Sequence, residues 1–76
     1  MSEIVVYGKQ ECADTLRTRA LLTDLGVAHA FVDVEASAAD AARAAEIGGS
    51  TRVPVVVLPD GAVLVEPSDD EVRAHL

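Results

Sequence analysis

The chain's single cysteine, Cys12, stands at a position where a thiol can be reactive. It follows the β-branched run from Ile4 to Tyr7 and a short polar loop, and it precedes an apolar-periodic segment, so a strand should end before it and a helix begin after it. A helix start offers unpaired N–H groups and the positive end of the helix dipole, which both favour thiolate. The sequence therefore predicts a nucleophilic Cys12. The alternative is a buried cysteine that acts as a small hydrophobic side chain.

Charged residues next to Cys12 act on the thiol in opposite directions. The carboxylates of Glu11 and Asp14 disfavour a thiolate by like-charge repulsion, whereas the cations Lys9 and Arg17 favour it. We therefore expect the pKa of Cys12 to be lowered, but not to an extreme degree.

Composition limits the kinds of protein that this chain can be. Its 76 residues suit one small domain over residues 1–76, with a core of aliphatic side chains because Tyr7 and Phe31 are the only aromatics. One cysteine cannot form an internal disulfide, and no Cys/His cluster predicts a metal site. The net charge of −7 argues against nucleic acid and anionic membranes as partners. Without a signal sequence or a long apolar run, we expect a soluble, cytoplasmic monomer.

The first half of the chain predicts a βαβ unit. Residues 4–7 form a continuous β-prone run, residues 13–25 a helix, and residues 27–34 a second strand, which should run parallel to the first. In the helix, the expected buried stripe consists of Leu16, Ala20, Leu21 and Leu25. Gly26 should take a left-handed conformation after the helix.

The second half predicts a helix, a hairpin and a final helix. Ser37 caps an alanine-rich helix over residues 38–47, which ends at Gly48-Gly49. The apolar strand of residues 54–58 turns at Pro59-Asp60-Gly61 into a return strand over residues 62–65. A capping box from Ser68 to Glu71 then opens the last helix, which should run to Leu76. The order β-α-β-α-β-β-α predicts an α/β fold, with a four-stranded mixed sheet and helices on both faces.

The strand, loop, Cys12 and helix, followed later by Val53-Pro54 before a buried strand, resemble the glutaredoxin family of the thioredoxin fold. The resemblance covers essentially the whole chain. It is greatest for the small bacterial glutaredoxin-like and mycoredoxin-like proteins, which share the ending seen here in residues 57–68, Val-Leu-Pro-Asp-Gly-Ala-Val-Leu-Val-Glu-Pro-Ser.

The resemblance implies a monothiol thiol-disulfide oxidoreductase, active in cell redox homeostasis. The family motif Cys-Pro-Tyr-Cys is here Cys12-Ala13-Asp14-Thr15, so Cys12 takes the nucleophilic position and Thr15 that of the resolving cysteine. Such a protein reduces mixed disulfides between proteins and a small thiol, either glutathione or mycothiol, with no bound cofactor. Thr15 would donate its hydroxyl to the sulfur. The alternative for Thr15 is an exposed helix residue that bonds its own backbone.

The resemblance also implies how the small thiol is bound. The Val53–Pro54 bond would be cis and would turn the main chain of Val53 toward Cys12, where an extended thiol peptide could pair with it. Lys9 and Arg52 would bind a carboxylate of the small thiol, although Lys9 can also be read as a solvated loop residue. Ser68 and Asp69 would hold its other end through backbone N–H groups. Before them, Glu66-Pro67 stands where the family has Gly-Gly, a departure that favours mycothiol over glutathione.

Two other functions fit the same residues. A redox-inactive binding module with the thioredoxin fold would explain why Ala13, Asp14 and Thr15 depart from the family motif. An iron–sulfur cluster bridging two chains would need only one cysteine from each. The glutaredoxin reading predicts instead that S-thiolated proteins and a small thiol are the partners.

Overall fold

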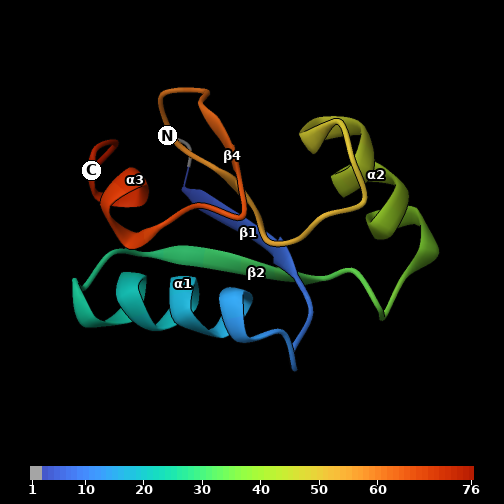
Figure 1. Ribbon diagram of the computed structural model, residues 1–76, viewed down its shortest axis with the longest axis horizontal. Helices are drawn as coiled ribbons and strands as arrows, with labels where there is room; N and C mark the ends of the chain where they lie inside the picture. The colour runs from blue at the N-terminus through green and yellow to red at the C-terminus, as the bar shows by residue number, and fades with distance from the viewer. Residues whose placement is uncertain (1–2) are drawn as a thin grey trace.

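The computed structural model describes residues 3–76, so residues 1 and 2 of the predicted domain lie outside the described part. Its four strands form one mixed sheet in the order β2-β1-β3-β4, in which β1 runs parallel to β2 and antiparallel to β3. The predicted fold class and element order are therefore confirmed (Figure 1). The elements are β1 (Ile4–Gly8), α1 (Ala13–Asp24), β2 (His29–Asp33), α2 (Ala38–Gly48), β3 (Val55–Val57), β4 (Val63–Val65) and α3 (Asp69–Arg73).

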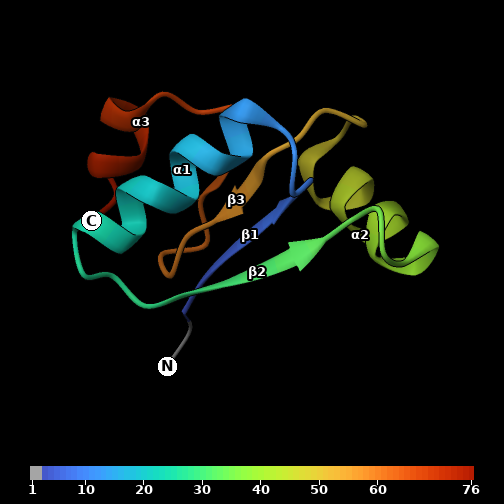
Figure 2. The same cartoon turned by 90° about the horizontal axis from the view of Figure 1, so that it is seen from below.

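Helices cover both faces of the sheet, with α1 beside α3 and α2 apart from them (Figures 1 and 2). Because neighbouring strand residues point to opposite faces, each strand contributes to two separate cores. The core under α1 and α3 contains Ile4, Val6, Leu21, Leu22, Val56, Leu58 and Val72. The core under α2 contains Tyr7, Val34, Ala44 and Val55.

The helix ends follow the capping signals in the sequence. Ser37 accepts a hydrogen bond from the N–H of Asp40 at 3.3 Å, and α2 ends at Gly49, whose φ of 76° is left-handed. At α3, the Ser68 hydroxyl accepts from the Glu71 N–H and the Glu71 carboxylate accepts from the Ser68 N–H, which is the predicted capping box. These local signals located the starts of α2 and α3 and the end of α2. The predicted end of the last helix at Leu76 is wrong, because α3 ends at Arg73.

The predicted buried stripe of the first helix is wrong. Leu16 and Leu25 are 47% and 46% exposed, whereas Thr15 and Thr18 are completely buried between α1 and the sheet. Of the predicted stripe, only Leu21 belongs to the core. The helix is turned so that two threonines pack against the sheet, and their methyl groups take the place of larger apolar side chains.

Candidate functional site

Cys12 is the residue that starts α1. Its backbone is extended (φ −79°, ψ 121°), its N–H donates to the Lys9 carbonyl at 3.2 Å, and its carbonyl accepts from the Leu16 N–H at 2.9 Å. The side chain is half-buried and makes no capping hydrogen bond. The sulfur is thus held at the mouth of the helix, beside N–H groups that have no partner within the helix.

The surroundings of the sulfur favour its negative form. The Thr15 hydroxyl, followed by the Thr15 N–H, makes the largest contribution to lowering the pKa of Cys12, and the Asp14 N–H adds to it. Burial and the charge of Asp14 act against them and raise the pKa, but the net effect is a pKa below the ordinary cysteine value. The neighbouring donor groups therefore have a larger effect on the pKa of Cys12 than the Asp14 carboxylate, which the family motif lacks.

The Thr15 hydroxyl is buried without a protein partner. Its oxygen makes no hydrogen bond to any atom of residues 3–76, so the prediction of an exposed residue that bonds its own backbone is excluded. A buried hydroxyl without a partner is costly, and a negative sulfur beside it supplies the missing acceptor. We infer that the bond from Thr15 forms when Cys12 loses its proton.

Gly8, the last residue of β1, fixes where the Thr15 side chain lies. A Cβ atom added to Gly8 would stand 2.5 Å from both Cγ2 and Oγ1 of Thr15, far inside van der Waals contact. Only a residue without a side chain lets Thr15 lie against the strand end. The end of β1 and the start of α1 therefore place the hydroxyl next to Cys12 together.

Thr15→Val is expected to raise the pKa of Cys12 and to slow its alkylation by iodoacetamide at pH 7 roughly two- to tenfold, because one hydrogen bond to the thiolate is lost. Although the thiol becomes less reactive, the protein should become more stable. Below the thiol pKa, removing a buried hydroxyl without a partner should increase the unfolding free energy by about 1 kcal/mol.

The pH dependence of stability gives a second measurement. Since the folded pKa of Cys12 lies below its unfolded value, the unfolded chain binds more protons between the two, and wild-type stability rises with pH across that window. Thr15→Val should flatten this rise in urea unfolding curves. Thr18→Val is the matched control, because Thr18 is equally buried and its hydroxyl also has no partner among residues 3–76. It should gain stability without changing the Cys12 titration; an unchanged titration in Thr15→Val would contradict the role of the hydroxyl.

A cavity of about 230 Å³ lies between α2 and the loop before β3, and half of the residues proposed for binding line it. Cys12, Pro54, Ser68 and Asp69 are not among its lining residues. Lys9, Arg52 and Val53 all line it, and the Val53–Pro54 peptide bond is cis, as the resemblance implied. The remaining lining residues are Val34, Glu35, Ala41, Ala44, Ala45, Ser50 and Thr51. The cavity therefore has an apolar wall of alanine and valine, two cations and one carboxylate, that of Glu35.

The two cations differ in their partners. Arg52 lies 3.8 Å from the Glu66 carboxylate, but its side chain is 73% exposed, so this pair is weak and can be exchanged. Lys9 forms no ion pair within residues 3–76. Glu66 itself has a φ of 50°, unusual for a residue other than glycine, and its N–H donates to the Pro54 carbonyl.

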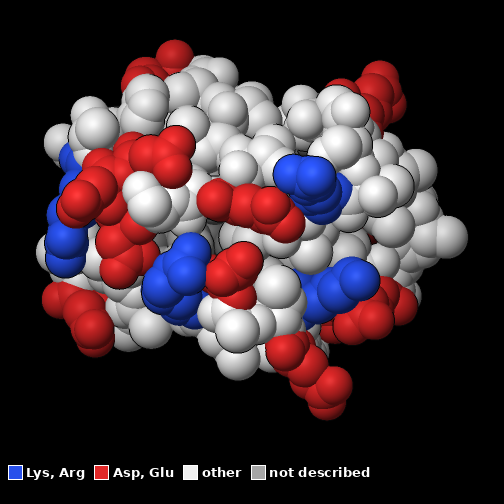
Figure 3. Space-filling view, in the orientation of Figure 1, with Lys and Arg blue, Asp and Glu red and all other residues white. Residues whose placement is uncertain are grey.

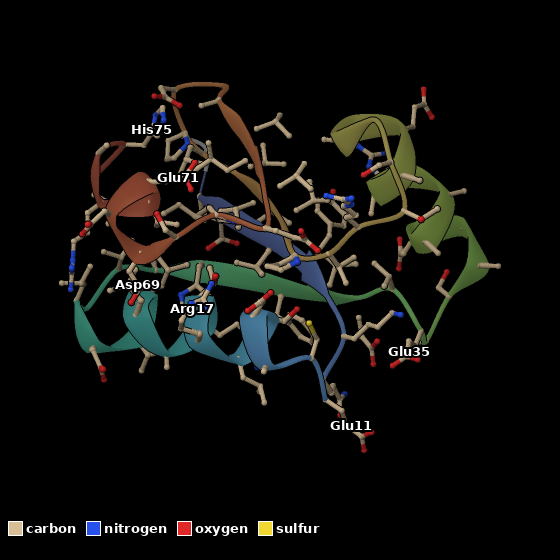
Figure 4. All side chains as sticks on the ribbon, in the orientation of Figure 1. Glu11, Arg17, Glu35, Asp69, Glu71 and His75 are labelled. Atoms are coloured by element: carbon tan, nitrogen blue, oxygen red, sulfur yellow. The ribbon has the colours of Figure 1, made fainter. Side chains whose placement is uncertain are left out.

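Ser68 and Asp69 lie on another side of the site, at the start of α3. The Ser68 N–H is occupied by the Glu71 carboxylate, so it can reach a ligand only if the capping box opens. Asp69 faces Arg17, whose Nε lies 3.6 Å from its carboxylate (Figure 4). Arg17 was expected from its position in the sequence to favour the thiolate, but it was not among the predicted site residues, because only folding brings it to Pro67 and Asp69.

Acidic and basic side chains are mixed on the face drawn in Figure 3, where every basic patch has acidic neighbours. In the described part of the chain, no three His, Cys, Asp or Glu side chains are grouped so that they could hold a metal ion. None of the described helices has the length and apolarity needed to cross a membrane.

This sheet, with its helices and a cysteine at the start of α1, makes the chain a thioredoxin fold. The sequence matches the family model described as Glutaredoxin over residues 4–63. It is 36% identical over 74 residues to a Mycobacterium tuberculosis (strain CDC 1551 / Oshkosh) protein named "Putative glutaredoxin MT3292", covering 96% of this chain and 88% of that protein. The chain belongs to the glutaredoxin family.

Solved structures agree on the fold. The glutaredoxin from Archaeoglobus fulgidus superposes with a TM-score of 0.85 at 24% identity, over 99% of this chain and 86% of that one. The thioredoxin-like protein BC3987 superposes with a TM-score of 0.87 at 27% identity, over 97% of this chain and all (100%) of that chain.

Proposed function

We propose that this chain is a monothiol glutaredoxin-like oxidoreductase in which Cys12 reduces mixed disulfides between proteins and a small thiol. Membership of the glutaredoxin family supports a thiol-disulfide oxidoreductase role in general. The observation that carries the monothiol form is that the one cysteine in the sequence lies half-buried at the start of α1, with a lowered pKa.

The reaction takes two exchange steps. The Cys12 thiolate attacks the small-thiol sulfur of the mixed disulfide, the S–S bond breaks, and the client protein leaves as a thiolate that takes up a proton. Cys12 is then joined to the small thiol. A second small-thiol molecule, as its thiolate, attacks the small-thiol sulfur that is bound to Cys12. A disulfide of two small thiols leaves, and the Cys12 thiolate is restored. The client gains the two electrons that the two small thiols lose.

The residues around the cavity support a binding role for that side of the site. In our proposal, Lys9 and Arg52 donate hydrogen bonds to the small thiol, to a carboxylate if it is glutathione and to hydroxyl groups if it is mycothiol, and Val53 with Pro54 offers main-chain polar groups to it. Ser68 and Asp69 border its other end. Lys9 forms no ion pair within residues 3–76, so an anion or another acceptor of the small thiol would be its first side-chain partner.

The cosubstrate is a low-molecular-weight thiol of the glutathione type, the class that the family uses. Glu66 and Pro67 before α3 support mycothiol over glutathione in our proposal, because proline has no N–H to offer a carboxylate and Glu66 would repel one. We further propose that the chain acts as one domain, as a monomer and in the cytoplasm.

The test is covalent capture followed by turnover. After incubation with glutathione disulfide or mycothiol disulfide, intact mass spectrometry should show one small thiol per chain, and excess small thiol should remove it. The same protein should reduce an S-thiolated peptide at a rate proportional to the small-thiol concentration. A chain that forms no adduct with either disulfide and does not reduce the S-thiolated peptide would be a redox-inactive binding module instead. Competition between the two disulfides identifies the cosubstrate.

A further inference from the structure

Arg17 connects the start of α1 to the turn before α3. Its guanidinium donates to the Asp14 carboxylate at 3.0 Å and to the Pro67 carbonyl at 3.2 Å, and its Nε lies 3.6 Å from the Asp69 carboxylate. One side chain thus contacts three groups, two of which lie about fifty residues further along the chain. Figure 4 shows Arg17 rising from α1 toward Asp69.

Asp69 needs this contact. Its Oδ1 atom is buried and has no hydrogen-bond partner among residues 3–76, so the nearby guanidinium is what balances its charge. A buried carboxylate oxygen without compensation is costly. The contact with Asp69 keeps the Arg17 side chain between α1 and α3, and the hydrogen bond from Arg17 keeps the Asp14 carboxylate at the same place.

Asp14 is also the carboxylate that opposes the reactive form of Cys12. It lies two residues after the cysteine in the first turn of α1, and its charge raises the pKa of the thiol. A carboxylate bound to a guanidinium has its charge largely balanced at close range, so its repulsion of a neighbouring anion is weakened.

We propose that Arg17 is a positioning residue for Cys12, one that holds the Asp14 carboxylate against the turn before α3 and keeps its charge from opposing the thiolate. This inference rests on the proposed function, in which Cys12 is the nucleophile. It adds a residue that acts on the sulfur through another side chain and belongs to no motif.

The charged residues on the neighbouring segments stay constant in the experiment. They are Lys9 and Glu11 in the loop before α1, Glu35 after β2, Arg52 before Pro54, Glu66 after β4, and Asp69 at the start of α3. Among the charged residues, it is Asp14 whose charge raises the pKa of Cys12.

The test is a double-mutant cycle read by the pH dependence of Cys12 alkylation with iodoacetamide. Arg17→Met should shift the titration to higher pH and lower the rate at pH 7 roughly two- to fivefold. Asp14→Asn should shift it to lower pH. The alkylation rate of the double variant at pH 7 should lie within about twofold of the rate of Asp14→Asn, because without the Asp14 carboxylate there is no charge for Arg17 to keep from the thiolate. Arg17→Lys should recover part of the alkylation rate. Added salt should narrow the difference in this rate between the wild type and Arg17→Met.

Arg73→Met is the matched control, since Arg73 also pairs with an aspartate three residues before it, Asp70, on another helix. It should leave the titration unchanged. A wild-type titration in Arg17→Met, or an equal loss with and without Asp14, would overturn the proposal. If Arg17→Met does not fold, the cycle with Arg17→Lys decides in the same way. Alkylation needs no disulfide substrate, so a wild-type chain without reductase activity would refute the proposed function while leaving this measurement intact.

Discussion

Cys12→Ser is expected to abolish the reduction of mixed disulfides, leaving only the background reaction of the small thiol. The chain has no other sulfur nucleophile than Cys12, and a serine hydroxyl does not ionise near neutral pH. The variant should also form no adduct with a small-thiol disulfide and show no thiolate absorbance. The loss of reduction and the loss of the adduct should both be complete, which makes this the largest effect on activity that the structure predicts.

The fold should survive this substitution and even gain from it. Cys12 occupies the N-cap of α1 without a side-chain capping bond, and serine is among the preferred residues there. Thermal unfolding of Cys12→Ser should therefore show a midpoint equal to or above that of the wild type. Cys12→Ala, which cannot cap, serves as the control and should be equally inactive. Reduction of the mixed disulfide at the wild-type rate by either variant would mean that Cys12 is not the nucleophile.

Local signals in the sequence predicted the fold well because each has a short-range physical cause. Ser37 and the Ser68–Glu71 box satisfy orphan N–H groups at helix starts, and Gly26 and Gly49 both take the left-handed conformation expected of them. The parallel pairing of β1 with β2 followed from the βαβ rule, whereas the spatial order β2-β1-β3-β4 was not predicted.

The buried face of α1 could not be predicted in the same way. Hydrophobic periodicity ranks Leu16 above Thr15, yet the strand end at Gly8 has room for the smaller side chain and Thr15 is the residue that faces it. Which face of a helix meets a sheet depends on shape complementarity between distant elements. Periodicity carries no information about that.

The candidate site was predictable where it depends on sequence neighbours and not where it depends on tertiary contact. Cys12 and Lys9 are three residues apart and joined by a backbone turn, so their proximity follows from the chain itself. The contacts of Arg17 with Pro67 and Asp69, and of Arg52 with Glu66, join segments that only folding brings together. Because such contacts form only on folding, a residue such as Arg17, which we propose to act on the Cys12 thiol through Asp14, can lie outside every motif.

Gly8→Ala is expected to reduce both stability and thiol reactivity, because its new methyl group would overlap the Thr15 side chain. Thr15 cannot move aside easily, since it is β-branched and completely buried in α1. Overpacking of this kind costs roughly 1–3 kcal/mol. That is a large share of the few kcal/mol (about 3–5) that the core of so small a domain supplies. Urea unfolding measures the loss, and iodoacetamide alkylation should become slower as the hydroxyl shifts from the sulfur.

The cause can be separated from general destabilisation with two further variants. Gly26→Ala should also be less stable, because Gly26 has a φ of 69°, but nothing lies within 4 Å of its added Cβ and Cys12 should titrate as in the wild type. Gly8→Ala combined with Thr15→Ala should be more stable than the sum of the two single changes allows, because the Cγ2 and Oγ1 contacts disappear. Recovery should be incomplete, since the Thr15 Cβ remains 3.1 Å from the new methyl group. Strictly additive losses would show that Gly8 does not act through Thr15.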